Sequence, residues 1–180
     1  MLETVRSYTQ ASKQWHYILG LGSNENAADR MASMIAALIQ ECGGLLLSSV
    51  CQTAPDSGEG SDYLNAVGSV ESSHSPEEFR SLCKSIETRL GRVRPSPVCA
   101  ADIDILAVWE VPAATCAQAF VSEPYFQPLV NSLLLELDLY SGKHPVNNCD
   151  HKTVDILLPD GRTVGQQVVR LVPLVTDTCY

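Results

Sequence analysis

Two acidic side chains stand close together in an otherwise apolar part of the chain. Asp102 and Asp104 lie two residues apart in segment 101–106, whose other members are Ala, Ile and Leu. If this segment is an extended strand, alternate side chains share a face, and the two acidic groups project together, roughly 6–7 Å apart. Ile103 and Ile105 then face the opposite side and enter a core. Because Mg²⁺ and similar cations prefer carboxylate oxygens, the pair predicts a metal site.

A basic doublet precedes the acidic pair. Arg92 and Arg94 follow a glycine that is expected to end a helix, and guanidinium groups bind phosphate well. Five of the twelve Lys and Arg residues fall within segment 80–94, whereas segment 95–142 contains no Lys, Arg or His. The doublet and the acidic pair together predict a site for a phosphate ligand and its cation. The alternative for the two arginines is a solvated basic loop.

Three polar residues border a loop rich in Pro, Gly, Ser and Asp. Thr53 opens this loop, and Tyr63 and Asn65 follow it at alternate positions, which in a strand share one face. An aromatic ring beside an amide suits a flat heterocycle, because one can stack and the other can hydrogen-bond. The alternative is that Tyr63 and Asn65 lie at the rim of a sheet and bind nothing.

One acidic residue of the expected second helix is also a candidate for ligand binding. Glu87 lies about one turn before Arg92. The alternative is a solvated ion pair with Arg80, Lys84 or Arg89, a kind of contact that usually contributes little to stability.

The fold follows from hydrophobic periodicity and from the positions of Gly and Pro. The pattern predicts strands at residues 15–21, 45–52, 63–71 and 102–109 and helices at 27–42 and 76–90. Their order along the chain is strand, helix, strand, strand, helix, strand. This order is typical of an α/β fold, an α+β sandwich with a ferredoxin-like core whose antiparallel sheet carries both helices on one face. The remaining chain predicts an additional C-terminal segment: a helix at 125–139, a short strand at 153–158 and a short helix at 163–171.

Length and composition limit the function classes. A chain of 180 residues fits one domain, expected over residues 15–180 behind a flexible N-terminal extension, 1–14. The formal charge of −9 makes nucleic acid an improbable partner, and the chain contains no apolar run long enough for a membrane helix. Seven cysteines, an odd number without Cys-x-x-Cys spacing, predict reduced thiols in a cytoplasmic protein. The oligomeric state stays open.

Several motifs in order resemble those of the 6-hydroxymethyl-7,8-dihydropterin pyrophosphokinase (HPPK) family. The resemblance runs from about residue 17 to residue 171 and rests on the motifs Gly20-Leu21-Gly22-Ser23-Asn24, Asp62-Tyr63-Leu64-Asn65-Ala66-Val67, Ile86-Glu87, Gly91-Arg92-Val93-Arg94, Asp102-Ile103-Asp104-Ile105-Leu106 and Leu158-Pro159-Asp160-Gly161.

The resemblance implies a ferredoxin-like fold and a transferase of folate biosynthesis. The family moves pyrophosphate from ATP, its co-substrate, to the pterin with the help of two Mg²⁺ ions. It implies Asp102 and Asp104 as magnesium ligands and catalytic residues, and Arg92 and Arg94 as catalytic residues that bind the phosphates. It also places Glu87 near the nucleotide. The pterin pocket would include Thr53, Tyr63 and Asn65.

The chain departs from the family pattern around the nucleotide. The loop between the doublet and the acidic pair is shorter, and Cys99 occupies the position of a family arginine. Pro124 stands at a family histidine position, Ser132 falls near a pterin-stacking aromatic, and no cation lies in segment 95–142. Three hypotheses therefore stay open: an active pyrophosphokinase, a catalytically impaired relative that binds a pterin or a partner, or a related metal-dependent transferase that acts on a different nucleotide or heterocycle. Lys143 or Lys152 could replace the lost cations.

Overall fold

A long antiparallel sheet forms the centre of the protein, which is described by a computed structural model over residues 13–55, 58, 60–96, 98–112, 121, 123–140 and 152–174. The sheet strands lie in the order β5 (Asp102–Val111), β1 (Gln14–Ser23), β4 (Tyr63–Ser72), β2 (Leu45–Leu47) and β8 (Val169–Leu171), and the short β3 (Cys51–Thr53) pairs with β4. A separate two-stranded sheet joins β6 (Ile156–Leu157) and β7 (Thr163–Val164).

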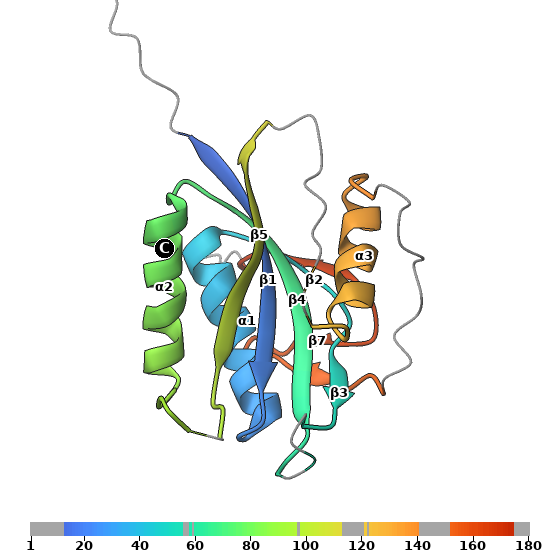
Figure 1. Ribbon diagram of the computed structural model, residues 1–180. Helices are drawn as coiled ribbons and strands as arrows, with labels where there is room; N and C mark the ends of the chain where they lie inside the picture. Colours follow the sequence, from blue (N-terminus) through green and yellow to red (C-terminus); the bar gives the residue numbers. More distant parts are fainter. Residues whose placement is uncertain are drawn as a thin grey trace, which may run out of the picture.

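Three helices of the described chain cover the two faces of this sheet (Figure 1). They are α1 (Ala27–Cys42), α2 (Pro76–Arg89) and α3 (Gln127–Glu136). Buried side chains of α1 and α2 pack with one face of β1 and β4 in the larger core cluster. Buried side chains of α3 pack with the other face in a second cluster. The predicted placement of the first two helices on one face is therefore confirmed.

The alternation predicted for the acidic segment is confirmed along the first half of β5. Ile103 is 2 % exposed and belongs to the core cluster on the α1 and α2 side, against which Ile105 also packs. Asp102 and Asp104 alternate with them, and Leu106 packs against the α3 side. The register between β1 and β5 shifts next to Ile18, which marks a β-bulge that re-phases the second half of β5.

Two predicted elements differ from the structure. The strand predicted at 45–52 is divided into β2 and β3. Between them the Oγ of Ser48, rather than a backbone carbonyl, accepts the hydrogen bond from the backbone N–H of Val67 at 2.9 Å, and this interrupts the strand ladder. The short helix predicted at 163–171 is wrong, since this segment forms β7 and β8. Its β-branched residues suit strands, and β8 pairs with β2, where it completes the edge of the sheet.

Some predictions fall partly outside the described residues. Of the predicted extension, 1–14, only Lys13 and Gln14 are described, and Gln14 already begins β1. Cys42, Cys83 and Cys99 are free thiols, whereas Cys116, Cys149 and Cys179 lie outside the description. Within the described part of the chain, no helix has the length and apolar character that a membrane crossing requires.

Candidate functional site

The candidate site lies at the end of the sheet where β1 ends and β4 and β5 begin, the lower end in Figure 1. Asp102 pairs with Gly22 of β1, and Gly22 pairs with Asn65 of β4, so these three residues form one row across the sheet. A Cβ on Gly22 would lie 3.2 Å from Asn65 Oδ1 and 4.0 Å from the Asp102 Cβ. Glycine at this position therefore leaves open the space between the acidic and the amide side chains.

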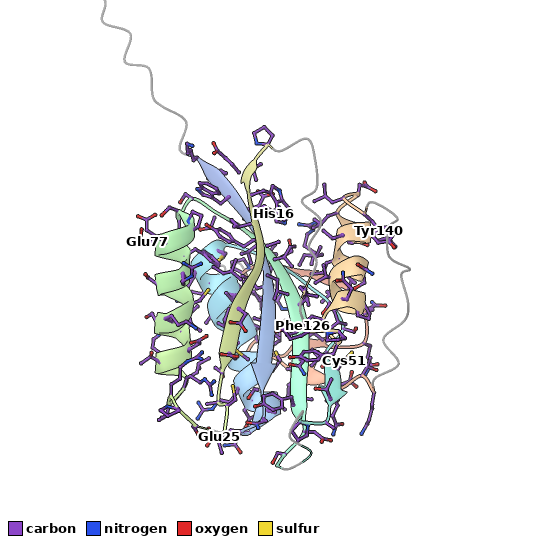
Figure 2. All side chains as sticks on the ribbon, in the orientation of Figure 1. His16, Glu25, Cys51, Glu77, Phe126 and Tyr140 are labelled. Carbon is purple, nitrogen blue, oxygen red and sulfur yellow. The ribbon has the colours of Figure 1, made fainter. Side chains whose placement is uncertain are left out.

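A cavity of about 780 Å³ lies beside this row. It brings together Asp102, Thr53, Tyr63 and Asn65, four of the residues chosen from the sequence, although they come from three strands. Its other lining residues are Asn24, Glu25, Asn26, Ala54, Pro55, Gly60, Ser61, Val98 and Tyr125. Figure 2 shows Glu25 at this end of the molecule. The cavity has the size and the mixed polar and aromatic lining of a small-molecule site.

The amide of Asn65 has a fixed orientation in this cavity. Its Nδ2 donates a hydrogen bond to the Thr53 Oγ1 at 2.7 Å, and the residue is 4 % exposed. β3 and β4 set this contact, because Thr53 pairs with Tyr63 and Cys51 pairs with Asn65. The amide can therefore present a defined hydrogen-bonding edge to a ligand beside the half-buried ring of Tyr63.

The basic doublet reaches the acidic pair from the loop after α2. Arg94 Nη2 donates to the Asp102 Oδ1 at 2.7 Å and to the Glu87 Oε2 at 3.3 Å. Arg92 Nη1 donates to the carbonyl oxygen of Val98 at 3.3 Å, and its Nε lies 3.9 Å from the Asp102 Oδ1. The two arginines are thus neighbours of Asp102 at the border of the cavity, rather than among the residues that line it.

Glu87 is buried, unlike a carboxylate that faces a ligand. It is 2 % exposed, and its Oε1 accepts the backbone N–H of Ile103 at 2.9 Å on the outer edge of β5. Lys84 Nζ lies 3.0 Å from both carboxylate oxygens. The ion pair with Lys84, the alternative to ligand binding, is therefore present, but its Glu87 carboxylate is buried rather than solvated. Contact of Glu87 with a nucleotide stays a prediction.

Asp104 is the carboxylate on β5 that lacks a cationic partner in the described part of the chain. Partial burial and then the negative charge of Asp102 raise the pKa of Asp104 above its ordinary value. A cation between the two carboxylates would relieve this repulsion. The described residues hold no cluster of three or more His, Cys, Asp or Glu that could bind a metal by itself. Two carboxylates nevertheless fit Mg²⁺, which keeps several waters and takes further oxygens from substrate phosphates.

The structure adds residues that the sequence analysis missed. Tyr125 lines the cavity with Tyr63, whereas Ser132 of α3 donates its hydroxyl to the Leu129 carbonyl. The turn after β1 is fixed to the loop before β5, because Asn24 Oδ1 accepts the backbone N–H of Cys99 at 2.6 Å. The aromatic character of Tyr125 was the only sequence signal for these contacts, which join segments far apart in the chain.

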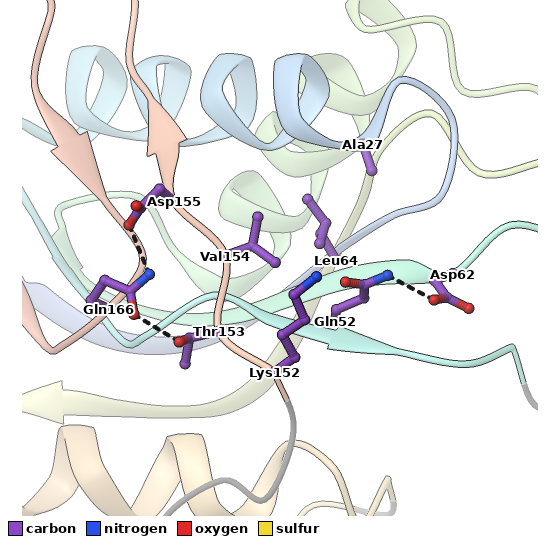
Figure 3. A pocket seen from close by; sticks show the side chains of 9 residues that line it. All are labelled: Ala27, Gln52, Asp62, Leu64, Lys152, Thr153, Val154, Asp155 and Gln166. Carbon is purple, nitrogen blue, oxygen red and sulfur yellow. Dashed lines mark hydrogen bonds between the residues drawn. The ribbon is translucent and has the colours of Figure 1, made fainter.

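Lys152 lies elsewhere, in a second cavity of about 580 Å³. Figure 3 shows its side chain there with Gln52, Asp62, Thr153 and Gln166. Neither Arg92 nor Arg94 lines this cavity. Lys152 is therefore not a replacement cation at the arginine doublet in this structure, and Lys143 lies outside the described residues.

Comparison with known protein families gives a match. The family model described as 7,8-dihydro-6-hydroxymethylpterin-pyrophosphokinase (HPPK) matches residues 18–129. This stretch is more than half of the chain, runs from β1 into α3, and contains every site residue predicted from the sequence. A comparison with curated proteins found no match.

Proposed function

Because the chain belongs to the HPPK family, we propose that the cavity beside Asp102 is the place where its reaction occurs. The protein is a pyrophosphokinase of folate biosynthesis, a transferase whose acceptor is a hydroxymethylpterin. The observation that carries the assignment of the site is the position of Asp102. This carboxylate lines the cavity with Tyr63 and Asn65, and it also contacts Arg94.

We assign the pterin to the part of the cavity lined by Thr53, Tyr63 and Asn65. The Asn65 amide, held by Thr53, hydrogen-bonds the polar edge of the heterocycle. The rings of Tyr63 and Tyr125, which both line the cavity, supply stacking surfaces. These contacts orient the hydroxymethyl oxygen toward the carboxylate end, and orientation of this kind accounts for a large part of the rate in phosphoryl transfer.

We assign the phosphates of ATP to the end of the cavity next to Asp102. The hydroxymethyl oxygen gives up its proton to solvent and forms a bond to the β-phosphorus. The bond from that phosphorus to the oxygen bridging to the α-phosphate breaks, so that AMP leaves. Arg92 and Arg94 bind phosphate oxygens there. Asp102 and Asp104 would hold Mg²⁺, two ions in our proposal, and bound Mg²⁺ would neutralise charge on the phosphates. Glu87 acts in this scheme by positioning Arg94 and β5.

Other parts of the proposal concern the molecule as a whole. The strand order β5-β1-β4-β2, with α1 and α2 on one face, supports a ferredoxin-like core. We propose a single domain over residues 15–180, because side chains of the C-terminal segment such as Leu171 belong to the same core cluster as α1. We further propose that the enzyme acts in the cytoplasm on small molecules.

A second candidate, a catalytically impaired relative that binds a pterin or a partner, rests on a specific feature of the sequence. Segment 95–142 offers no cationic side chain to the nucleotide. Each charge-assisted contact is worth about 1.5–3 kcal/mol, so the loss of several lowers nucleotide binding or turnover by decades.

Measurement of AMP release separates the two candidates. The purified protein, ATP, Mg²⁺ and 6-hydroxymethyl-7,8-dihydropterin should yield AMP and the pterin diphosphate, quantified by chromatography. Asp102→Ala and Asp104→Ala should each abolish this product, whereas Asp160→Asn, at an exposed aspartate paired with Arg162, should retain it. Pterin binding in calorimetry without AMP release supports the impaired relative. Full turnover in both alanine variants contradicts the assigned site.

A further inference from the structure

Asp102 is already neutralised by side chains of its own chain. Two carboxylates, those of Asp102 and Glu87, face three cationic groups, Arg92, Arg94 and Lys84, in one connected set of contacts. Asp104 forms no ion pair in the described chain and is repelled by Asp102. Arg94 is the link in this set, because its Nη2 contacts both Asp102 at 2.7 Å and Glu87 at 3.3 Å. A divalent cation that takes the Oδ1 of Asp102 must therefore compete with a guanidinium.

The two arginines of the doublet are held differently. The side chain of Arg92 is 13 % exposed, donates to the Val98 carbonyl and has a buried Nε without a hydrogen-bond partner in the described chain. The side chain of Arg94 is 51 % exposed, and its contacts are those to the two carboxylates. Arg92 is fixed between loop and strand, whereas solvent can replace the contacts of Arg94 at little cost.

Building on the proposed metal site, we propose that Arg94 is the exchangeable counter-cation of Asp102. In the metal-free protein its guanidinium occupies Asp102 Oδ1, and when a divalent cation binds, Arg94 releases this oxygen. Arg92 does not exchange. The ion pair with Glu87 gives Arg94 a second anchor, so that the released side chain keeps one contact at the border of the cavity.

The exchange is favoured because the divalent cation carries a higher charge than the Arg94 guanidinium and because Arg94 is half exposed to solvent. A half-exposed ion pair contributes little to stability, so release of Arg94 is a small penalty on metal binding. A divalent cation interacts with both carboxylates of β5 and relieves the repulsion that Asp104 experiences from Asp102. Exchange keeps Asp102 neutralised at every stage, which favours a folded and soluble apo state before metal and nucleotide arrive.

Calorimetric titration with Mn²⁺, without nucleotide, measures the competition directly. Arg94→Ala removes the competitor and should tighten Mn²⁺ binding by about two- to fivefold. The matched control is Arg89→Ala, an exposed arginine of α2 that pairs with Glu41, and its Mn²⁺ affinity should equal that of the wild type. Binding that is unchanged or weaker in Arg94→Ala overturns the exchange.

A spectroscopic readout distinguishes exchange at Asp102 from a general charge effect. In spectra of ¹⁵N-labelled arginine side chains, the Arg94 signal, assigned by its loss in Arg94→Ala, should shift in step with Mg²⁺ saturation, and the Arg89 signal should stay in place. An Arg94 signal that does not move at saturating Mg²⁺ overturns the proposal. Asp102→Asn tests the premise separately: if it leaves Mn²⁺ affinity unchanged, the metal site itself is misassigned.

Discussion

At the scale of single residues, the carboxylates of the site differ in whether a cationic side chain neutralises their charge. Asp102 is neutralised by Arg94, whereas Asp104 has no cationic partner in the described chain and lies near a like charge. Glu87 is buried, yet it is satisfied by a backbone N–H and two cationic side chains. The same chemical group, a carboxylate, therefore has three different environments on and beside one strand, and each environment leads to a separate prediction.

Asp104 is expected to reduce stability at neutral pH. Because its pKa is raised in the folded protein, the folded state binds this proton more tightly than the unfolded chain. The favourable contribution is complete below the ordinary value of 3.8 and is lost as the pH rises through the higher folded-state pKa. Asp104→Asn should therefore raise the free energy of unfolding at pH 7, by no more than about 1 kcal/mol because solvent screens an exposed group.

Thermal unfolding at a series of pH values checks this prediction. The stability advantage of Asp104→Asn over the wild type should shrink on acidification and disappear at about pH 3.5, just below the ordinary Asp pKa. An advantage that is the same at every pH would mean that side-chain packing, rather than charge, causes the difference.

Glu87 is expected to be a strong stabilising residue. Glu87→Ala removes the acceptor of the Ile103 N–H and leaves Lys84 and Arg94 without their buried partner, at a cost of about 2–4 kcal/mol. Glu87→Gln keeps an acceptor oxygen and should cost less. Denaturant unfolding measures both. The control is Glu110→Ala, whose exposed pair with Lys13 should change the free energy of unfolding by less than about 0.5 kcal/mol.

At the scale of elements, helix ends and close contacts between layers position the site. α2 begins with a capping box, in which Ser75 Oγ accepts from the Glu78 N–H and the Glu78 carboxylate accepts from the Ser75 N–H. Its other end leads into the arginine loop. On the opposite face, the ring of Phe126, immediately before α3, approaches β1 where Gly20 has no side chain (Figure 2).

The capping box should contribute measurably to the stability of α2. Ser75→Ala should lower the free energy of unfolding by about 1 kcal/mol at pH 7, and Ser81→Ala, on the exposed face of the same helix, by clearly less. The backbone and side-chain hydrogen bonds of Ser75 lower the pKa of Glu78, so this part of the stability is present above the ordinary value of 4.5 and is lost as the pH falls through the lowered pKa. Circular dichroism melts at pH 7 and pH 3 test both statements.

Gly20 should be intolerant of a side chain for a packing reason. A Cβ there would lie 2.9 Å from two ring carbons of Phe126, which is 5 % exposed. Gly20→Ala should therefore cost about 1–3 kcal/mol. Combined with Phe126→Leu, which removes the ring, the cost of Gly20→Ala should become smaller. A double-mutant cycle from denaturant unfolding checks this coupling, and strict additivity contradicts the contact.

At the scale of the whole molecule, the chain after α3 returns to complete the sheet. β8 pairs with β2 at the edge of the sheet, and the side chain of Leu171, 2 % exposed, joins the core cluster of α1. Ile156 and Leu158 join the same cluster. The C-terminal segment is therefore part of the core rather than an appendage to it.

Loss of one buried side chain of this segment should destabilise the entire protein. Leu171→Ala should lower the free energy of unfolding by about 2–4 kcal/mol and move a single transition, because its core cluster also contains Tyr17 and Leu38. Leu157→Ala is the matched control, since Leu157 is 68 % exposed and should have little effect. Two separate transitions in calorimetry would contradict a single cooperative unit.

The elements whose signals are local follow directly from the sequence. The apolar stripe and the terminal glycine define α1, the Ser75-Pro76 start defines α2, and alternation along β5 separates the isoleucines from the acidic pair. These signals arise between residues a few positions apart, where helix or strand geometry alone sets which side chains share a face. In segment 163–171 the β-branched residues did not suffice to predict a strand, because β8 forms by pairing with β2, which lies far away in the sequence.

The residue types of the site were determined by the sequence, and their grouping was decided by the tertiary structure. Asp102 and the pair Tyr63 and Asn65 are visible as motifs, but only the pairing of three antiparallel strands through Gly22 brings them to one cavity. The contacts of Arg94 and the burial of Glu87 depend on how a loop returns to the edge of β5. Such contacts join distant segments, and their energies depend on burial, which periodicity along the chain does not contain.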